Sequence, residues 1–292
     1  MKRVNCHLCC GCFFMCICFF QIGGIGYLSQ IISSPTSSES LRIEAAALIS
    51  QLTAPEIVSD FRQSRFHQHL EVLLRALTDL MEQSRDPLVF LVASSAVANI
   101  TFMGSIVFEF LAQDNAAKIL VEGSKEGKVE SLNIKDQVVT IFANMAEDQA
   151  CRESIKQYEG IPLLIELLQT QVAGFETEDN KQASDEVVHD AKLCEQIQQK
   201  SAIALARLSK DKTCAAEIKQ LEGISIFSRI CRTSSYRNKS VPVLIACLAA
   251  LRRLHHALGP SSFHQDDIDI LVRPKMIESI FSCSSMSEES FV

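Results

Sequence analysis

The chain has 292 residues, of which 47% are hydrophobic and 22% are charged, with twelve cysteines and no tryptophan. Its formal net charge of -7 argues against a general nucleic-acid binder, because such a protein needs a basic surface to neutralise phosphates. The apolar content is enough for a well-packed core, and the length is long for one ordinary domain but normal for a repeat protein.

Residues 1–32 form a cysteine-rich apolar leader. Six of the twelve cysteines lie in this segment, around an apolar run from Cys12 to Phe20. Because Lys2 and Arg3 precede this run, the leader is similar to a signal peptide, although the run is too short for a comfortable membrane span. Two other interpretations are S-acylation at Cys9, Cys10, Cys16 or Cys18, and a metal site at Cys6, His7, Cys9 and Cys12.

We favour a plainer interpretation of the leader, in which it derives from an alternative first exon or from an error in the gene model. No second ligand pair follows the cysteines at a suitable distance, so we predict no metal and no cofactor. Secretion would also place a glycan at the sequon Asn99-Ile100-Thr101, inside a helix that we expect in the core. Membrane association is left open, and removal of residues 1–33 is expected to leave the melting temperature nearly unchanged.

Residues 33–40 are rich in serine and are predicted to be a linker, with Ser40 as the N-cap of the first long helix. The segment 41–281 is predicted to be a domain of repeated helices. Within it, Asp86-Pro87 opens the second repeat, because proline fits the first turn of a helix.

The clearest copy of the repeated unit spans residues 136–168. A second copy follows 63 positions later, where Asn144 matches Arg207, Cys151 matches Cys214 and Gly160 matches Gly223. Each copy begins with a long amphipathic helix, continues with a short helix and a Glu-Gly-Ile corner, and ends with a second apolar helix. The glycine of the corner is expected to permit the sharp change of direction.

One position of the long helix recurs along the whole domain and forms a ladder. Its members are Gln51, Asn99, Asn144, Arg207 and Arg253, at steps of 48, 45, 63 and 46 residues. The long step contains an acidic insertion, residues 172–190, which we expect to be a solvated loop. Two alternatives for the insertion are docking of a basic partner and occupation of the protein's own basic groove.

Residues 282–292 are predicted to be a flexible polar tail. Its last residues, Ser290, Phe291 and Val292, have the form of a class I PDZ ligand. In this form Val292 fills an apolar pocket, its carboxylate binds a nest of backbone N–H groups, and the Ser290 hydroxyl contacts the helix of the domain.

No motif for catalysis is present in the sequence. We find no phosphate loop, no Gly-x-Ser-x-Gly elbow and no His-Glu-x-x-His pair, so we predict that the protein is not an enzyme. Cys151 and Cys214 recur at one repeat position, which indicates packing, since a nucleophile is not expected twice in a structural period.

The Ala-Asn-apolar end of the long helix, followed by Glu-Gly-Ile-Pro-Leu-Leu, resembles the armadillo repeat. The resemblance implies an all-α fold, an armadillo-like right-handed α-solenoid of about five repeats, in which the ladder lines a concave groove. Asparagines spaced by a repeat can bond the backbone of an extended peptide. Arg207, Arg252 and Arg253 favour an acidic peptide, unless such arginines pair with acidic side chains of the neighbouring repeat.

Three stretches are similar to the carboxy-terminal half of the inscuteable family of polarity adaptors. They are LRIEAAALISQLT after the linker, AVANITFMGSIVFEFLAQDNAAKIL across residues 96–120, and EESFV at residues 288–292. The resemblance implies a non-enzymatic adaptor in cell polarity and in mitotic spindle orientation during asymmetric cell division, in the cytoplasm and at the apical cell cortex.

The same resemblance implies the partners. One is a PDZ domain of a partitioning-defective polarity scaffold, which would take Ser290, Phe291 and Val292. The family's peptide for a tetratricopeptide spindle adaptor precedes the repeats and has no counterpart in residues 1–40, so that link is expected to be absent. The alternatives are a generic armadillo cargo or transcription-cofactor binder and a membrane-tethered scaffold.

Overall fold

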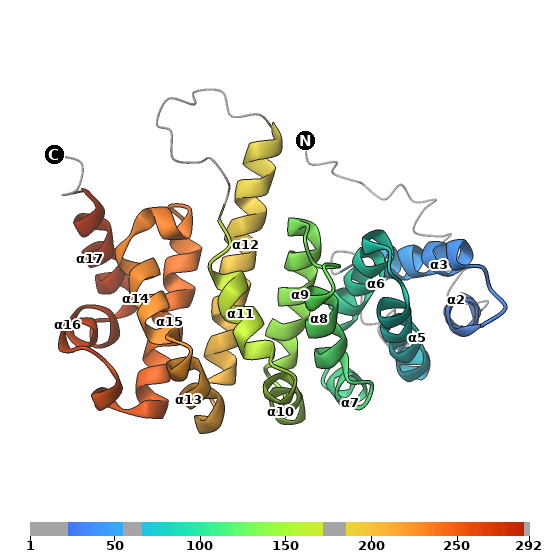
Figure 1. The fold of residues 1–292 in the computed structure, drawn as a ribbon, viewed down its shortest axis with the longest axis horizontal. Helices are drawn as coiled ribbons and strands as arrows, with labels where there is room; N and C mark the ends of the chain where they lie inside the picture. The colour runs from blue at the N-terminus through green and yellow to red at the C-terminus, as the bar shows by residue number, and fades with distance from the viewer. Residues whose placement is uncertain (1–22, 55–65, 172–184, 289–292) are drawn as a thin grey trace. The chain divides into compact units, whose positions relative to one another are not determined.

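The computed structural model describes residues 23–54, 66–171 and 185–288, and it shows helices and no strand within these ranges (Figure 1). The chain divides into two compact units. We call residues 1–129 the N-terminal unit and residues 130–292 the C-terminal unit. The all-α prediction is confirmed.

The N-terminal unit places its long helices side by side. Helix α3 packs along α6, and α2 packs on α3 and α5. Ile49, Leu73 and Phe90 are fully buried between these helices. The described elements are α2 (Gly24–Ser33), α3 (Glu39–Leu52), η1 (His67–His69), α5 (Leu70–Gln83), α6 (Pro87–Ile100), α7 (Ile106–Gln113) and α8 (Ala116–Lys125).

The C-terminal unit is organised around one long helix, α12, which packs against α9 and α15. Phe142, Leu205 and Leu251 from these three helices are fully buried. The described elements are α9 (Leu132–Met145), α10 (Gln149–Gln157), α11 (Gly160–Leu168), α12 (Asp185–Leu208), α13 (Lys212–Gln220), α14 (Gly223–Arg232), η2 (Ser234–Arg237), α15 (Val241–Leu258), η3 (Pro260–Ser262), α16 (Gln265–Asp267), η4 (Ile268–Val272) and α17 (Met276–Glu288).

Side-chain caps fix where these helices begin. The Asp86 carboxylate accepts the N–H of Leu88 at 2.8 Å, and Pro87 occupies the first turn of α6 as the sequence predicted. The cap of α3 was predicted wrongly. It is Ser38, whose hydroxyl accepts the N–H of Leu41 at 3.3 Å, so α3 already includes Ser40.

At the corner between the two short helices of a repeat, the role predicted for the glycine is wrong. The left-handed backbone falls on Glu159 and Glu222, with φ of 62° and 59°, and not on the glycines that follow them. Gly223 is needed for a different reason, because a Cβ there would lie 2.6 Å from the Ile218 Cγ2 atom and 2.8 Å from its carbonyl oxygen. The corner therefore needs glycine because Ile218 lies too close to leave room for a Cβ.

The first helix of the fold lies partly inside the predicted leader. Helix α2 begins at Gly24, and its Ile25, Leu28 and Ile32 are at most 4% exposed. Residues 24–32 therefore belong to the N-terminal unit, and the polar connection to α3 is shorter than the predicted linker. All six leader cysteines and His7 lie outside the described residues.

The predicted insertion and tail also overlap helices. Helix α12 begins at Asp185, so residues 185–190 are helical, while residues 172–184 lie outside the described part. Helix α17 continues to Glu288, with Cys283 buried, so the fold extends beyond the predicted start of the tail at residue 282. The PDZ-ligand residues Ser290, Phe291 and Val292 lie outside the described residues.

Helix α15 is the one helix in the described ranges that is long and apolar enough to cross a membrane, by length and composition alone. It packs against α12 and α14, and its Leu244, Leu248 and Leu251 are at most 1% exposed. These contacts are those of a core helix.

Candidate binding ladder on the long helices

The structure places every ladder residue near the C-terminal end of a long helix. In the N-terminal unit Gln51 lies on α3 and Asn99 on the adjacent α6. In the C-terminal unit Asn144, Arg207 and Arg253 lie on α9, α12 and α15, which pack in this order. The sequence register therefore corresponds to a position in the C-terminal half of a long helix in each repeat.

Three ladder side chains bind the backbone of the preceding long helix. Asn99 donates from Nδ2 to the Ser50 carbonyl at 2.8 Å. Arg207 donates from Nη1 to the Ala143 carbonyl at 2.6 Å, and Arg253 makes a longer bond of 3.4 Å to the Ala206 carbonyl. In each case the acceptor is the residue immediately before the preceding ladder residue.

The acceptor carbonyls explain why polar side chains recur at this position. Each lies in the last turn of its helix, where carbonyls have no intrahelical N–H partner. The C-terminal end of a helix also carries partial negative charge, which favours the cationic arginines. The ladder thus connects successive repeats, and its role in binding a peptide stays a prediction.

Around Arg207 the C-terminal unit gathers charged side chains at one place. The Glu147 carboxylate forms an ion pair with the Arg207 Nε at 2.7 Å through one oxygen and accepts a hydrogen bond from the Lys210 ammonium at 2.7 Å through the other. Arg253 also lies within electrostatic range of Glu147. We call Glu147, Arg207, Lys210 and Arg253 the ladder charge cluster.

The cluster changes the acidity of its carboxyl. The hydrogen bond from Lys210 and the charges of Arg207, Lys210 and Arg253 hold the pKa of Glu147 below its usual value, against a smaller opposing effect of burial. Glu147 is therefore ionised near neutral pH. The cluster carries three permanent cations around one carboxylate, and such an arrangement can bind a further anion.

Sequence reasoning missed Glu147 and Lys210. A signal for them existed, since they lie 63 positions apart and three residues after Asn144 and Arg207 respectively. They therefore share one repeat position. The alternative weighed for Arg207 is also observed, because it does pair with an acidic side chain of the neighbouring repeat.

Arg252 has a structural role that removes it from the predicted acidic-peptide site. It donates from Nε to the Val272 carbonyl at 3.1 Å and from Nη2 to the Ser279 hydroxyl at 2.8 Å, and it also bonds the Pro274 carbonyl. These bonds attach the segment between η4 and α17 to α15.

The recurring cysteines are packed inside the C-terminal unit. Cys151 and Cys214 are 0% and 2% exposed. Burial raises the pKa of the Cys151 thiol to about 12 and also raises the pKa of Cys214, so neither thiol is ionised at neutral pH. Within the described ranges no group of three or more His, Cys, Asp or Glu side chains is arranged to hold a metal ion.

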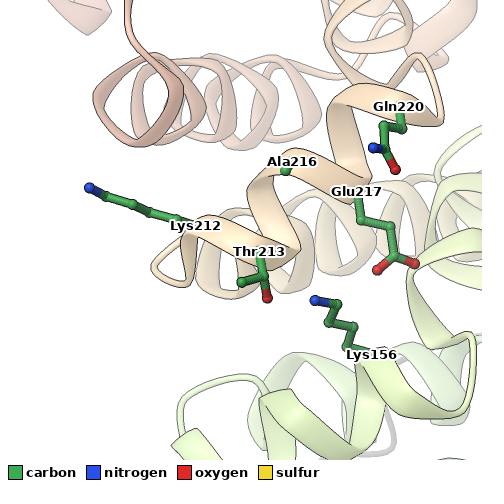
Figure 2. A pocket seen from close by; sticks show the side chains of 6 residues that line it. All are labelled: Lys156, Lys212, Thr213, Ala216, Glu217 and Gln220. Carbon is green, nitrogen blue, oxygen red and sulfur yellow. The ribbon is translucent and has the colours of Figure 1, made fainter.

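A shallow hollow of ≈ 420 Å³ lies between α10 and α13 (Figure 2). In Figure 2 the Lys156 ammonium extends from α10 toward the Glu217 carboxylate on α13, while Lys212 points away. Burial raises the pKa of Glu217, and Lys156 opposes this rise. The remaining lining residues are Thr213, Ala216 and Gln220.

Solved structures share the fold of the chain. A designed armadillo repeat protein, YIII(Dq)4CqI, has a TM-score of 0.59 at 15% identity and covers 90% of this chain and 98% of its own. Computationally designed armadillo repeat proteins for modular peptide recognition reach 0.60 at 14% identity over 89% of this chain and 98% of theirs. The chain is an armadillo-like α-solenoid, as the repeat predicted.

The sequence comparisons identify the family. The chain belongs to the inscuteable family, because the family model "Protein inscuteable C-terminal" matches residues 3–292. The human protein inscuteable homolog is 37% identical over 273 residues, and the mouse homolog is 36% identical over 274 residues. Each comparison covers 93% of this chain and 45% of the relative, so the chain spans about half the length of these relatives.

The family match also bears on the predicted leader. It starts at residue 3, so it includes nearly all of the cysteine-rich leader. The first helix of the fold, α2, lies in the same region. Residues 24–32 therefore belong to the folded unit, while the origin of the leader in an alternative first exon or in an error of the gene model stays a prediction.

Proposed function

We propose that this protein is a non-enzymatic adaptor in cell polarity and mitotic spindle orientation during asymmetric cell division. The observation that carries the proposal is the family match over residues 3–292. The armadillo-like fold supports a scaffold role, since stacked repeats offer long surfaces to partners. The proposal includes a location in the cytoplasm and at the apical cell cortex.

The proposed link to the polarity machinery is a class I PDZ ligand at Ser290, Phe291 and Val292. The proposal takes Val292 as the residue that carries the terminal carboxylate. Support comes from the chemistry of the three residues, which supply an apolar side chain, a carboxylate and a hydroxyl at the positions that such a domain reads. The proposed partner is a PDZ domain of a partitioning-defective polarity scaffold.

Titration of a fluorescent peptide ending in Glu-Glu-Ser-Phe-Val against that domain tests the link. Adding one residue after Val292 moves the carboxylate out of its nest, and Val292→Asp places a charge in an apolar pocket, so both changes should abolish binding. Ser290→Ala removes one hydrogen bond, worth about 0.5–1.5 kcal/mol, and should only weaken binding. Equal affinity of the native and the extended peptide would refute the PDZ ligand.

A second proposed function is binding of an acidic peptide at the ladder of the C-terminal unit. It is supported by the excess of Arg207, Lys210 and Arg253 over the single carboxylate of Glu147. If this binding persists while the PDZ titration fails, the generic armadillo peptide binder becomes the better description. The absence of a tetratricopeptide link stays an expectation, since residues 1–22 lie outside the described part.

A further inference from the structure

In the part of the chain that the structure describes, two carboxylates pair with cations of α12. They are Glu147 and Asp136, and they differ in exposure. Glu147 lies on the connection between α9 and α10, its side chain is 43% exposed, and it binds side chains that are 26% and 46% exposed. Asp136 also pairs with a cation of α12, the Lys200 ammonium at 2.6 Å, but only 11% of its side chain is exposed. Glu147 is thus the accessible carboxylate of the two.

The ladder charge cluster is not electrically balanced. Arg207 and Lys210 share the carboxylate of Glu147, and Arg253 makes no ion pair of its own within the described residues, although its charge acts on Glu147. Three cations around one anion leave an excess of two positive charges. A ligand with carboxylates spaced along an extended backbone would complete this balance.

Exchange of Glu147 for a ligand carboxylate is physically easy. Ion pairs that are open to water contribute little, because water screens them and because long side chains lose entropy when they pair. Arg207 would stay oriented during the exchange, since its Nη1 is held by the Ala143 carbonyl at 2.6 Å while Nε makes the bond to Glu147. The guanidinium is therefore positioned before the ligand arrives.

We propose that Glu147 is an internal competitor for the acidic peptide: it holds Arg207 and Lys210 in the unbound protein, and a ligand carboxylate replaces it. This inference rests on the acidic-peptide function proposed above. It adds Lys210 to the site and makes Glu147 the residue that limits affinity. A designed armadillo repeat protein with a TM-score of 0.58 at 16% identity, over 91% of this chain and 98% of its own, was solved in complex with peptide (KR)4. That peptide is basic, whereas the peptide proposed for the ladder charge cluster is acidic.

The test uses the full chain and a fluorescein-labelled (Asp-Glu)4 octapeptide, followed by fluorescence anisotropy at low salt. Glu147→Gln keeps the shape of the side chain and removes its charge, so it should tighten binding by about threefold to tenfold. Lys210→Gln and Arg253→Gln should each weaken binding by roughly threefold or more. Melting curves by circular dichroism establish that each variant is folded.

Two matched variants separate a local exchange from a general change of charge. Asp136→Asn removes a carboxylate between the same two helices and should leave the affinity unchanged. Lys212→Gln removes a cation of α13 that extends away from the hollow and should also have no effect. Equal tightening by Asp136→Asn and Glu147→Gln would overturn the competitor role, and so would an unchanged affinity of Glu147→Gln.

The acidic insertion provides another decisive comparison. Deletion of residues 173–184 should leave the affinity for (Asp-Glu)4 unchanged. A tightening as large as that of Glu147→Gln would make the chain's own insertion the occupant and would overturn the proposal. The PDZ titration is independent of all these variants, so failure of the ladder site and failure of the adaptor proposal are distinguishable.

Discussion

The two units use the same repeat position with different side chains, and the difference shows what the position is for. In the N-terminal unit Asn99 binds the carbonyl of the preceding helix with a side chain that ends there. In the C-terminal unit Arg207 makes the equivalent bond and uses a second nitrogen to bind Glu147. A guanidinium has five N–H donors, so it can connect two repeats and still bind an anion, whereas the short amide has little reach beyond the first bond.

The surfaces next to the ladder follow the same division. Three residues after Asn99 the N-terminal unit exposes Phe102, which is 57% accessible. Three residues after Arg207 the C-terminal unit has Lys210. The bond between repeats is common to both units, while the neighbouring side chains are apolar in one and charged in the other. We therefore expect the units to contact chemically different partners.

The largest expected effect is the loss of stability when α2 is removed from the N-terminal unit. Deleting residues 1–33 removes α2 and exposes the surfaces that Ile25, Leu28 and Ile32 cover, which should cost on the order of 5 kcal/mol. This reverses the expectation from the sequence. Deleting residues 1–22 is the control, since it keeps every described helix. Urea unfolding followed by circular dichroism measures both, and equal midpoints would show that α2 does not stabilise the unit.

A smaller effect is expected at the corners that the two units build differently. In the C-terminal unit Gly223→Ala should cost about 1–3 kcal/mol, because the new Cβ meets a backbone carbonyl that cannot move away. In the N-terminal unit Asn115 takes the left-handed conformation and Ala116 already follows it. Ala116→Gly should therefore cost only about 0.5–1 kcal/mol. Unfolding curves of the two variants compare the corners, and a neutral Gly223→Ala would contradict the close approach.

Loss of the hydrogen bond between repeats should lower the free energy of unfolding by a similar amount in either unit. Asn99→Ala and Arg207→Ala should each lower the free energy of unfolding by about 1 kcal/mol, since each removes one hydrogen bond between repeats. Binding should separate them, because only Arg207→Ala removes a cation of the proposed site. Reversing charge at both Arg207 and Arg253 should abolish binding of (Asp-Glu)4. Loss of binding with Asn99→Ala, measured by anisotropy, would argue against a site confined to the C-terminal unit.

The smallest expected effect is the pH dependence of the ladder charge cluster. The folded-state pKa of Glu147 lies below its unfolded value, so its stabilisation is present above the unfolded pKa and is lost as the pH falls through the folded pKa. Because 43% of the side chain is exposed, the contribution at neutral pH should be only about a few tenths of a kcal/mol. Urea unfolding of the native protein and of Glu147→Gln should differ by this amount near pH 7, and the two should converge as the pH falls below the folded-state pKa of Glu147. A difference that persists in acid would show that the charge is not its cause.

Much of the fold was predictable because its signals are local. The three- and four-residue steps of apolar side chains identify the helices, and the separation of 63 residues identifies the repeat, without any knowledge of contacts. The start of α6 at Asp86-Pro87 is equally local. The boundaries failed where a segment is helical only through tertiary contacts, as in α2, whose burial against α3 and α5 makes part of an apparent leader a core helix.

The site depended far more on the tertiary structure. The sequence alone determined that polar side chains recur at Gln51, Asn99, Asn144, Arg207 and Arg253, and that the last two are basic. It left open whether Arg207 binds a peptide or a neighbouring repeat. The stacking of α12 on α9 showed that Arg207 contacts the neighbouring repeat, because it brings Arg207 within 2.7 Å of a carboxylate 60 residues away and within 2.6 Å of the Ala143 carbonyl. Such pairings depend on how the helices stack, and the free energy of that stacking comes from buried side chains that do not belong to the ladder.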